Sequence, residues 1–365
     1  MPPPPLTTIY KEINSTEIST DIYLPPPSPQ HASSSSPHPH PHPHPVLINI
    51  HGGAFMLGHS GMVSMPQIDD CLARGWIVVV PDHRLCPGVD VLSGPVQDVR
   101  DLLAWVYAGH LDAFLHGHGH GKAQYQDQYQ YQYRVDTERV MAFGTSSGGF
   151  LALSLGYDVP RAPAAILDFY GPVHFDHPFW GAPLPHVQAL LPPGGFEPGF
   201  LERVYEEFPV PTRSGISLEG QGKRTSPTTG SSATTQTTSS QGQGDANRPD
   251  FSRPRDAFAL TQIANGTVLS AIYPRGCGAG FDDIDPVAKV DGGFPPTFIV
   301  HGDADRMVPV DLSRRLFGVL KEKGVECGMV EVEGEDHTFA MGMEVGSRTW
   351  EVQRRGFDWL DAVIR

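Results

Sequence analysis

Short apolar runs are the feature of this 365-residue chain that most constrains its fold. A strand with one wet face alternates apolar and polar residues, whereas a strand buried on both faces is apolar almost throughout. Runs of the second kind, rich in Val, Ile, Leu and Phe, lie at residues 46–50, 76–80, 140–143, 165–170 and 297–300. They predict the central strands of a mostly parallel sheet that is covered on both faces.

Helix-like stretches separate these runs. Apolar residues three and four positions apart mark one amphipathic helix at Val96, Val99, Leu103 and Val106. Further helices are expected at residues 257–271, at 310–323 before Gly324, and at the C-terminus. Two short strands at 8–13 and 21–24 precede this pattern, and a last strand is expected at 328–332. The alternation predicts a single doubly wound α/β domain over residues 1–365.

Three segments interrupt the alternation, in a chain with 36 prolines and 40 glycines. Residues 25–45 contain a His-Pro run, and residues 117–133 contain Gly-His and Tyr-Gln repeats, so both are interpreted as low-complexity insertions. Residues 171–285 hold apolar and aromatic residues and are expected to form an inserted helical cap. Within them, residues 214–250 are predicted to be disordered, because 220–250 contain no aromatic residue and no Leu, Ile or Val.

Composition excludes several classes of function. The formal net charge of −15 argues against nucleic acid or an anionic membrane as a partner. No apolar run is long enough to span a membrane, and the N-terminus lacks the pattern of a secretory signal, so a cytoplasmic location is expected. The four cysteines are widely spaced, which predicts neither a zinc site nor a disulfide framework. We therefore expect no metal and no cofactor; the oligomeric state is not indicated.

Gly144–Gly148 lies where the apolar run at 140–143 gives way to a helix-like run. A serine at a sharp strand-to-helix turn has strained backbone geometry, and glycines two positions away on either side leave room for it. The Ser146 hydroxyl would then be exposed at the edge of the sheet. A Gly-x-Ser-x-Gly pattern also arises by chance in glycine-rich chains, so the interpretation depends on accompanying residues.

A serine nucleophile needs an imidazole to accept its proton and an acid to orient that imidazole. Asp305 follows the predicted strand at 298–300, and His337 follows the one at 328–332. Because the carboxyl ends of parallel strands meet at one edge of a sheet, Ser146, Asp305 and His337 can converge. Asp303 and Asp336 compete for the acid role; Asp305 is preferred because it lies further past its strand, where a turn can direct it toward the imidazole.

A hydrolytic serine also needs donors for the oxyanion that forms when it attacks a carbonyl. The buried run at 46–50 leads directly into His51, Gly52, Gly53 and Ala54. Glycines let backbone amides face a substrate without side-chain obstruction, so the amides of Gly53, Ala54 and Ser147 are the predicted donors. The alternative is an ordinary Gly-Gly turn. His51 is expected to brace this loop.

Taken together, these motifs resemble those of a known family. They are His51-Gly52-Gly53-Ala54-Phe55, Asp82-His83-Arg84-Leu85-Cys86-Pro87, Asp136-Thr137-Glu138-Arg139-Val140, Gly144-Thr145-Ser146-Ser147-Gly148-Gly149, His301-Gly302-Asp303-Ala304-Asp305 and Asp336-His337. The set is similar to the α/β-hydrolase superfamily, close to hormone-sensitive-lipase-like carboxylesterases, over residues 46–110, 134–172 and 285–365. The resemblance implies a serine hydrolase with Ser146 as nucleophile, Asp305 as acid and His337 as base.

The sequence also departs from that family. Ala54 replaces the usual third glycine, Thr145 and Ser147 stand where an acidic residue and an alanine are common, and Met307-Val308-Pro309 is similar to prolyl-oligopeptidase relatives. The leading prediction is hydrolysis of a carboxylic ester of a small or medium, mostly apolar substrate through an acyl-enzyme intermediate. Amide, lactone or peptide hydrolysis, a non-catalytic ligand-binding protein that kept the pocket, and a scaffold recruited through the low-complexity tracts are the alternatives. Retention of His337 argues against the ligand-binding protein.

Overall fold

The computed structural model describes residues 4–26, 43–117, 133–215, 251–276 and 280–365. Within these residues the strands form one eight-stranded sheet in the order β1-β2-β4-β3-β5-β6-β7-β8. The strands are β1 (Leu6–Ile13), β2 (Thr16–Tyr23), β3 (Pro43–Ile50), β4 (Ile77–Pro81), β5 (Arg134–Thr145), β6 (Ala165–Phe169), β7 (Thr297–Gly302) and β8 (Cys327–Val332). All neighbours from β4 to β8 pair in parallel, whereas β1–β2 and β2–β4 are antiparallel. The predicted mostly parallel sheet is confirmed.

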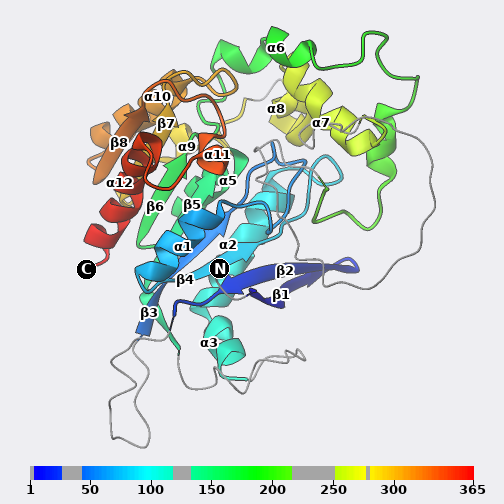
Figure 1. The fold of residues 1–365 in the computed structure, drawn as a ribbon. Coiled ribbons are helices and arrows are strands. Elements are labelled where there is room, and N and C mark those ends of the chain that lie inside the picture. Colours follow the sequence, from blue (N-terminus) through cyan, green and yellow to red (C-terminus); the bar gives the residue numbers. More distant parts are fainter. Residues whose placement is uncertain (1–3, 27–42, 118–132, 216–250, 277–279) are drawn as a thin grey trace, which may run out of the picture.

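Helices cover both faces of the sheet, which explains why the central strands are apolar throughout (Figure 1). Successive residues of β3 face opposite sides: Leu47 packs with α1 (Met65–Ala73) and α12 (Arg348–Val363). Ile48 packs in the cluster that includes α2 (Gln97–Tyr107), α5 (Ser147–Leu153) and α10 (Val310–Glu322). The predicted doubly wound α/β architecture is therefore confirmed.

Several element boundaries differ from the sequence prediction. β3 begins at Pro43, inside the predicted insertion at 25–45. The single helix expected at 257–271 is two helices, α7 (Pro254–Asn265) and α8 (Val268–Ile272). Gly266 ends α7 because it adopts a left-handed backbone with φ of 67°. The interiors of the two predicted low-complexity insertions and nearly all of the predicted disordered segment 214–250 lie outside the described residues.

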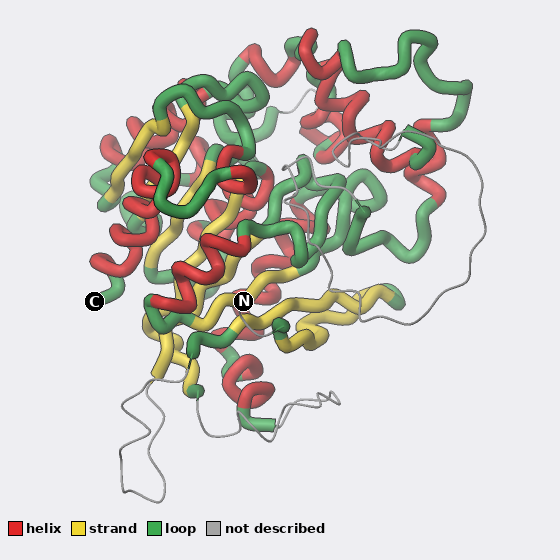
Figure 2. Tube along the Cα trace, viewed as in Figure 1, coloured by secondary structure: helices red, strands yellow, loops and turns green. Residues whose placement is uncertain are grey.

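The segment between β6 and β7, residues 171–285, is called the cap segment here. Its helices α6 (Pro185–Gln188), α7 and α8 lie together at one end of the sheet (Figures 1 and 2). α6 and α7 share a small apolar cluster of their own, made of Val187, Leu260, Ile263 and Ala264. The buried Arg255 is one of the residues that attach the cap segment to the rest of the molecule: its Nη1 donates to the carbonyls of Met56 (2.8 Å) and Cys86 (2.6 Å).

The other α-helices of the described residues are short: α3 (His110–Leu115), α9 (Pro286–Lys289) and α11 (Phe339–Gly342). α11 immediately follows the loop that carries His337, and Thr338, the residue before it, has a left-handed φ of 68°. No helix in the described ranges is long and apolar enough to cross a membrane.

Candidate active site

Ser146 occupies a strained turn between β5 and α5. Its backbone has φ of 52° and ψ of −125°, a conformation that L-residues rarely adopt. The turn is too tight for side chains, since a Cβ at Gly144 would lie 2.0 Å from the Gly148 carbonyl oxygen. A Cβ at Gly148 would lie 2.1 Å from the carbonyl oxygen of Ile50, at the end of β3. The two glycines thus allow the turn to form against the neighbouring strand.

The structure brings Ser146, Asp305 and His337 together at the carboxyl ends of β5, β7 and β8. The Ser146 hydroxyl lies 2.9 Å from Nε2 of His337, and Nδ1 of His337 lies 2.6 Å from Oδ2 of Asp305. With its proton on Nδ1, the imidazole donates to the carboxylate and keeps a lone pair on Nε2 for the serine proton. The Tyr170 ring packs edge-on against the imidazole, with centroids 4.8 Å apart. This arrangement can activate a serine for attack on a carbonyl.

Four donors surround the carboxylate of Asp305. Oδ1 accepts from the amides of Met307 and Val308, each at 2.8 Å, and Oδ2 accepts from the imidazoles of His337 and His301. Burial by itself raises the pKa of this carboxyl, but the charge of His337 and the hydrogen bonds from the two imidazoles outweigh burial and hold the pKa well below its usual range. Asp305 therefore stays ionised, as the acid of a triad must.

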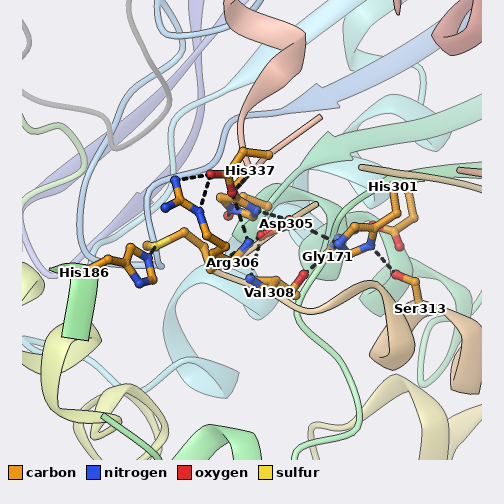
Figure 3. A network of polar contacts seen from close by, with 12 residues as sticks. Gly171, His186, His301, Asp305, Arg306, Val308, Ser313 and His337 are labelled. Atoms are coloured by element: carbon orange, nitrogen blue, oxygen red, sulfur yellow. Dashed lines mark hydrogen bonds and ion pairs between the residues drawn. The ribbon is translucent and has the colours of Figure 1, made fainter. Parts of the chain in front are cut away.

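The two competing carboxylates hold loops together. Oδ1 of Asp303 accepts from the Gly334 amide at 2.6 Å, and Asp336 pairs with the Arg306 guanidinium, whose Nε lies 2.8 Å from Oδ2. Both contacts join the loop after β7 to the loop after β8, and Figure 3 shows Arg306 beside His337. They fix the separation of the two segments that carry Asp305 and His337.

The predicted oxyanion loop follows β3 and has unusual backbone geometry. Gly53, Ala54 and Phe55 all have positive φ values, of 126°, 53° and 65°. The Gly53 carbonyl accepts from the amides of Met56 (3.1 Å) and Leu57 (2.9 Å), which closes the turn, and a Cβ at Gly53 would lie 2.2 Å from the Leu57 oxygen. Ser147 is the first residue of α5, where amides have no helical acceptor. All three predicted donors lie on segments that adjoin Ser146; their role as donors stays a prediction.

Two buried histidines support this loop. Nδ1 of His51 lies 2.7 Å from the Gly52 carbonyl, in keeping with the bracing role expected for it. The His51 ring stacks on His83, with centroids 4.6 Å apart, and burial is the main cause that lowers the pKa of both side chains. Neutral imidazoles can stack without charge repulsion. Across the described residues, no group of three or more His, Cys, Asp or Glu could hold a metal ion.

Sequence reasoning missed two polar residues beside the site. Asp168 in β6 is fully buried; its Oδ1 accepts from the Gly171 amide at 3.0 Å, and burial raises its pKa to about 7. His301 in β7 is also fully buried and contacts Asp305. The signal for both was a titratable residue inside or directly after an apolar strand. Asp168 interrupts the run at 165–170, and His301 immediately follows the run at 297–300.

A strained serine hydrogen-bonded to a histidine, which in turn bonds an aspartate, on a doubly wound sheet, is the arrangement of a serine hydrolase of the α/β type. Comparisons with known families agree: residues 35–114 match the BD-FAE family model, and residues 268–365 match the model of the prolyl oligopeptidase family. The chain has the α/β-hydrolase fold, and two of its segments match models of families of hydrolases.

Solved structures show the same fold. Esterase 2 of Thermogutta terrifontis, in a structure described as phosphoramylated by tabun, superposes with a TM-score of 0.55 at 16% identity, covering 100% of this chain and 96% of that one. A protein from Staphylococcus aureus subsp. aureus Mu50 superposes with a TM-score of 0.59 at 16% identity, covering 99% and 100%. At these identities the likeness concerns the fold.

Curated relatives match almost the whole chain but are far longer. The non-reducing polyketide synthase ascC of Acremonium egyptiacum is 27% identical over 97% of this chain, and Preu6 of Preussia isomera, also a non-reducing polyketide synthase, is 28% identical over 97%. The chain spans only 15% and 14% of those two proteins.

Proposed function

We propose that this protein is a carboxylic ester hydrolase that acts through an acyl-enzyme intermediate. Ser146 serves as nucleophile, His337 as general base and then general acid, and Asp305 as the acid that orients the imidazole. The observation that carries the proposal is the unbroken hydrogen-bond chain from Ser146 to His337 to Asp305, which starts at a strained strand-to-helix turn. The esterase fold supports the same conclusion.

In the proposed reaction, Ser146 Oγ attacks the carbonyl carbon while its proton passes to Nε2 of His337. The ionised Asp305 stabilises the imidazolium through Nδ1, and the amides of Gly53, Ala54 and Ser147 stabilise the oxyanion. Collapse of the tetrahedral intermediate releases the alcohol, which takes the proton from Nε2. Water then attacks the acyl-enzyme by the same route and releases the acid. These steps need neither metal nor cofactor.

The comparisons favour two refinements of the substrate. Because the relatives that match 97% of the chain are polyketide synthases, we propose that a polyketide-type acyl group, carried as an ester or thioester, is the natural acyl donor. The match of residues 268–365 to the prolyl oligopeptidase family favours a peptide bond as the alternative. With a polyketide-type acyl donor, the partner is a small molecule. A cytoplasmic location stays a prediction.

The test uses the full chain with p-nitrophenyl acetate, butyrate and octanoate, an aromatic acyl thioester, and a peptidyl p-nitroanilide. Ser146→Ala is compared with Ser270→Ala, the same change at an exposed serine. We expect ester hydrolysis by the wild type and the control, a loss of at least about a thousandfold in Ser146→Ala, and a fluorophosphonate adduct on Ser146. Undiminished hydrolysis by Ser146→Ala would contradict the proposal; faster cleavage of the thioester or the anilide would decide the bond type.

A further inference from the structure

We propose that His301 is a positioning residue for catalysis, a second imidazole that holds the acid of the triad from the side opposite His337. This inference rests on the proposed function, because it assigns the task of His301 through Asp305. Figure 3 shows His301 between Ser313 and Asp305, with His337 on the far side of the carboxylate. His301 itself touches no reacting atom.

The contacts of His301 account for both of its ring nitrogens. Nε2 lies 2.7 Å from the Val308 carbonyl oxygen and 3.1 Å from Oδ2 of Asp305, and Nδ1 lies 2.7 Å from Oγ of Ser313 on α10. The side chain is completely buried. A buried imidazole with every polar atom engaged has one orientation, so it provides a fixed reference for the carboxylate.

These contacts also fix the position of the proton. A carbonyl oxygen can only accept, so the short contact to Val308 requires a hydrogen on Nε2. The Ser313 hydroxyl can donate to Nδ1, which favours the same tautomer. The Nε2 hydrogen is then shared between the Val308 oxygen and Oδ2 of Asp305. By donating to Nδ1, Ser313 keeps the imidazole hydrogen on Nε2, the nitrogen that faces Asp305.

Oδ2 of Asp305 consequently receives two imidazole hydrogen bonds, at 2.6 Å from His337 and at 3.1 Å from His301. The amides of Met307 and Val308 hold Oδ1. Without His301, the carboxylate would keep its amide contacts but could rotate about them, and its Oδ2 would face His337 alone. The second imidazole therefore fixes the plane of the carboxylate and limits how much negative charge it offers to His337.

Other charged or titratable groups near His337 come from the elements packed around it. Among the described residues they include the Asp336–Arg306 pair, on the His337 loop and the facing loop. They also include Tyr170 after β6, whose ring packs on His337 and, with centroids 6.2 Å apart, on His301. None of these is changed by substitution at Ser313. A change in proton affinity of His337 in such a variant can thus be traced to Asp305.

The sign of the effect follows from competition for Oδ2. Loss of the His301 donor leaves more negative charge on Oδ2 to stabilise protonated His337. The pKa of His337 therefore rises, and the imidazole loses its proton to become the neutral base only at a higher pH. The acid limb of the kcat/KM profile should move upward by about half a pH unit, and kcat should fall about tenfold to a hundredfold as the acid loses its fixed orientation. KM should change little, because His301 contacts no substrate.

The experiment compares His301→Leu, which has no donor, with His301→Gln, whose amide hydrogen can replace that on Nε2. Ser313→Ala is paired with Ser154→Ala, the same change at a buried serine whose hydroxyl donates to the Leu151 carbonyl. Each full-length variant is assayed for ester hydrolysis against pH, and the His337 imidazole is titrated by NMR with histidine-specific ¹⁵N labelling.

We expect the acid limb and the His337 NMR midpoint to move upward by the full amount in His301→Leu and by a smaller amount in Ser313→Ala. Both should stay near the wild-type values in His301→Gln and should be unchanged in Ser154→Ala. Equal acid limbs and NMR midpoints in all variants would overturn the inference, as would an equal loss of kcat in Ser154→Ala. If His301→Leu does not fold, Ser313→Ala decides. The NMR titration requires no turnover, so a wild type without esterase activity would refute the proposed function and leave the coupling of His301 to His337 separately measured.

Discussion

Replacing Asp168 by Asn should remove a specific pH dependence of stability. Asp168 lies in β6, opposite Gly144 of β5 and Ile299 of β7, and it is fully buried. Its Oδ1 accepts from Gly171, while its Oδ2 has no hydrogen-bond partner among the described residues. Burial therefore favours the neutral acid and raises its pKa from 3.8 to about 7.

The magnitude follows from the two pKa values. Below about pH 4 the Asp168 carboxyl is protonated in both the folded and the unfolded chain, and its contribution to the free energy of unfolding is fully present. As the pH rises toward 7, the unfolded chain ionises and the folded one does not, so stability is lost until the folded pKa is passed. The interval between 3.8 and about 7 corresponds to about 4 kcal/mol of unfolding free energy. Asn has a similar shape and does not titrate.

The assay is urea unfolding of wild type and Asp168→Asn between about pH 4 and about pH 8. The free energy of unfolding of the wild type, relative to the variant, should fall by about 4 kcal/mol across this range. Asp176→Asn removes the same charge at an exposed position and should show no such trend. A difference between wild type and Asp168→Asn that is flat, or that rises with pH, would refute the reasoning that burial dominates this carboxyl.

Three further outcomes are expected. Asp305→Asn should lower kcat about 10⁴-fold with the fold intact, because the amide no longer stabilises the imidazolium; steady-state kinetics and circular dichroism check this. Gly148→Ala should destabilise the protein by about 2 kcal/mol, since its Cβ would meet the Ile50 oxygen at 2.1 Å; thermal unfolding measures it. Arg255→Met should also cost about 2 kcal/mol, because the Met56 and Cys86 carbonyls lose their buried donor; urea unfolding measures it, and an unchanged midpoint would contradict it.

The sheet could be predicted because its strands are buried on both faces and therefore show continuous apolar runs. The placement of Ser146, Asp305 and His337 at one edge followed from the same runs, since each residue comes just after a strand. The break between α7 and α8 was missed because apolar residues continue on both sides of Gly266. Propensity alone did not indicate that this glycine would take a left-handed conformation.

Other parts of the site depend on contacts between distant segments. Asp303, Asp305 and Asp336 are chemically alike, and what separates them is that Gly334 and Arg306 engage the first and last. Those partners lie about thirty residues from the carboxylates they bind, so no local pattern reports the pairing. The contact of His301 with Ser313 and the pairing of Asp168 with Gly144 of β5 also join residues that are apart in the sequence.

The hydrogen bonds that join Ser146, His337 and Asp305 are made by residues outside the cap segment. These bonds connect the ends of β5, β7 and β8, and Asp305 is held in addition by His301 of β7, which contacts Ser313 of α10. The cap segment is attached by several contacts, among them Arg255 with the carbonyls of Met56 and Cys86, and its His186 lies 3.4 Å from the Met307 sulfur, beside Asp305. Because the three side chains lie outside the cap segment, exchange of this contiguous insertion would alter the surroundings of the site without replacing Ser146, His337 or Asp305.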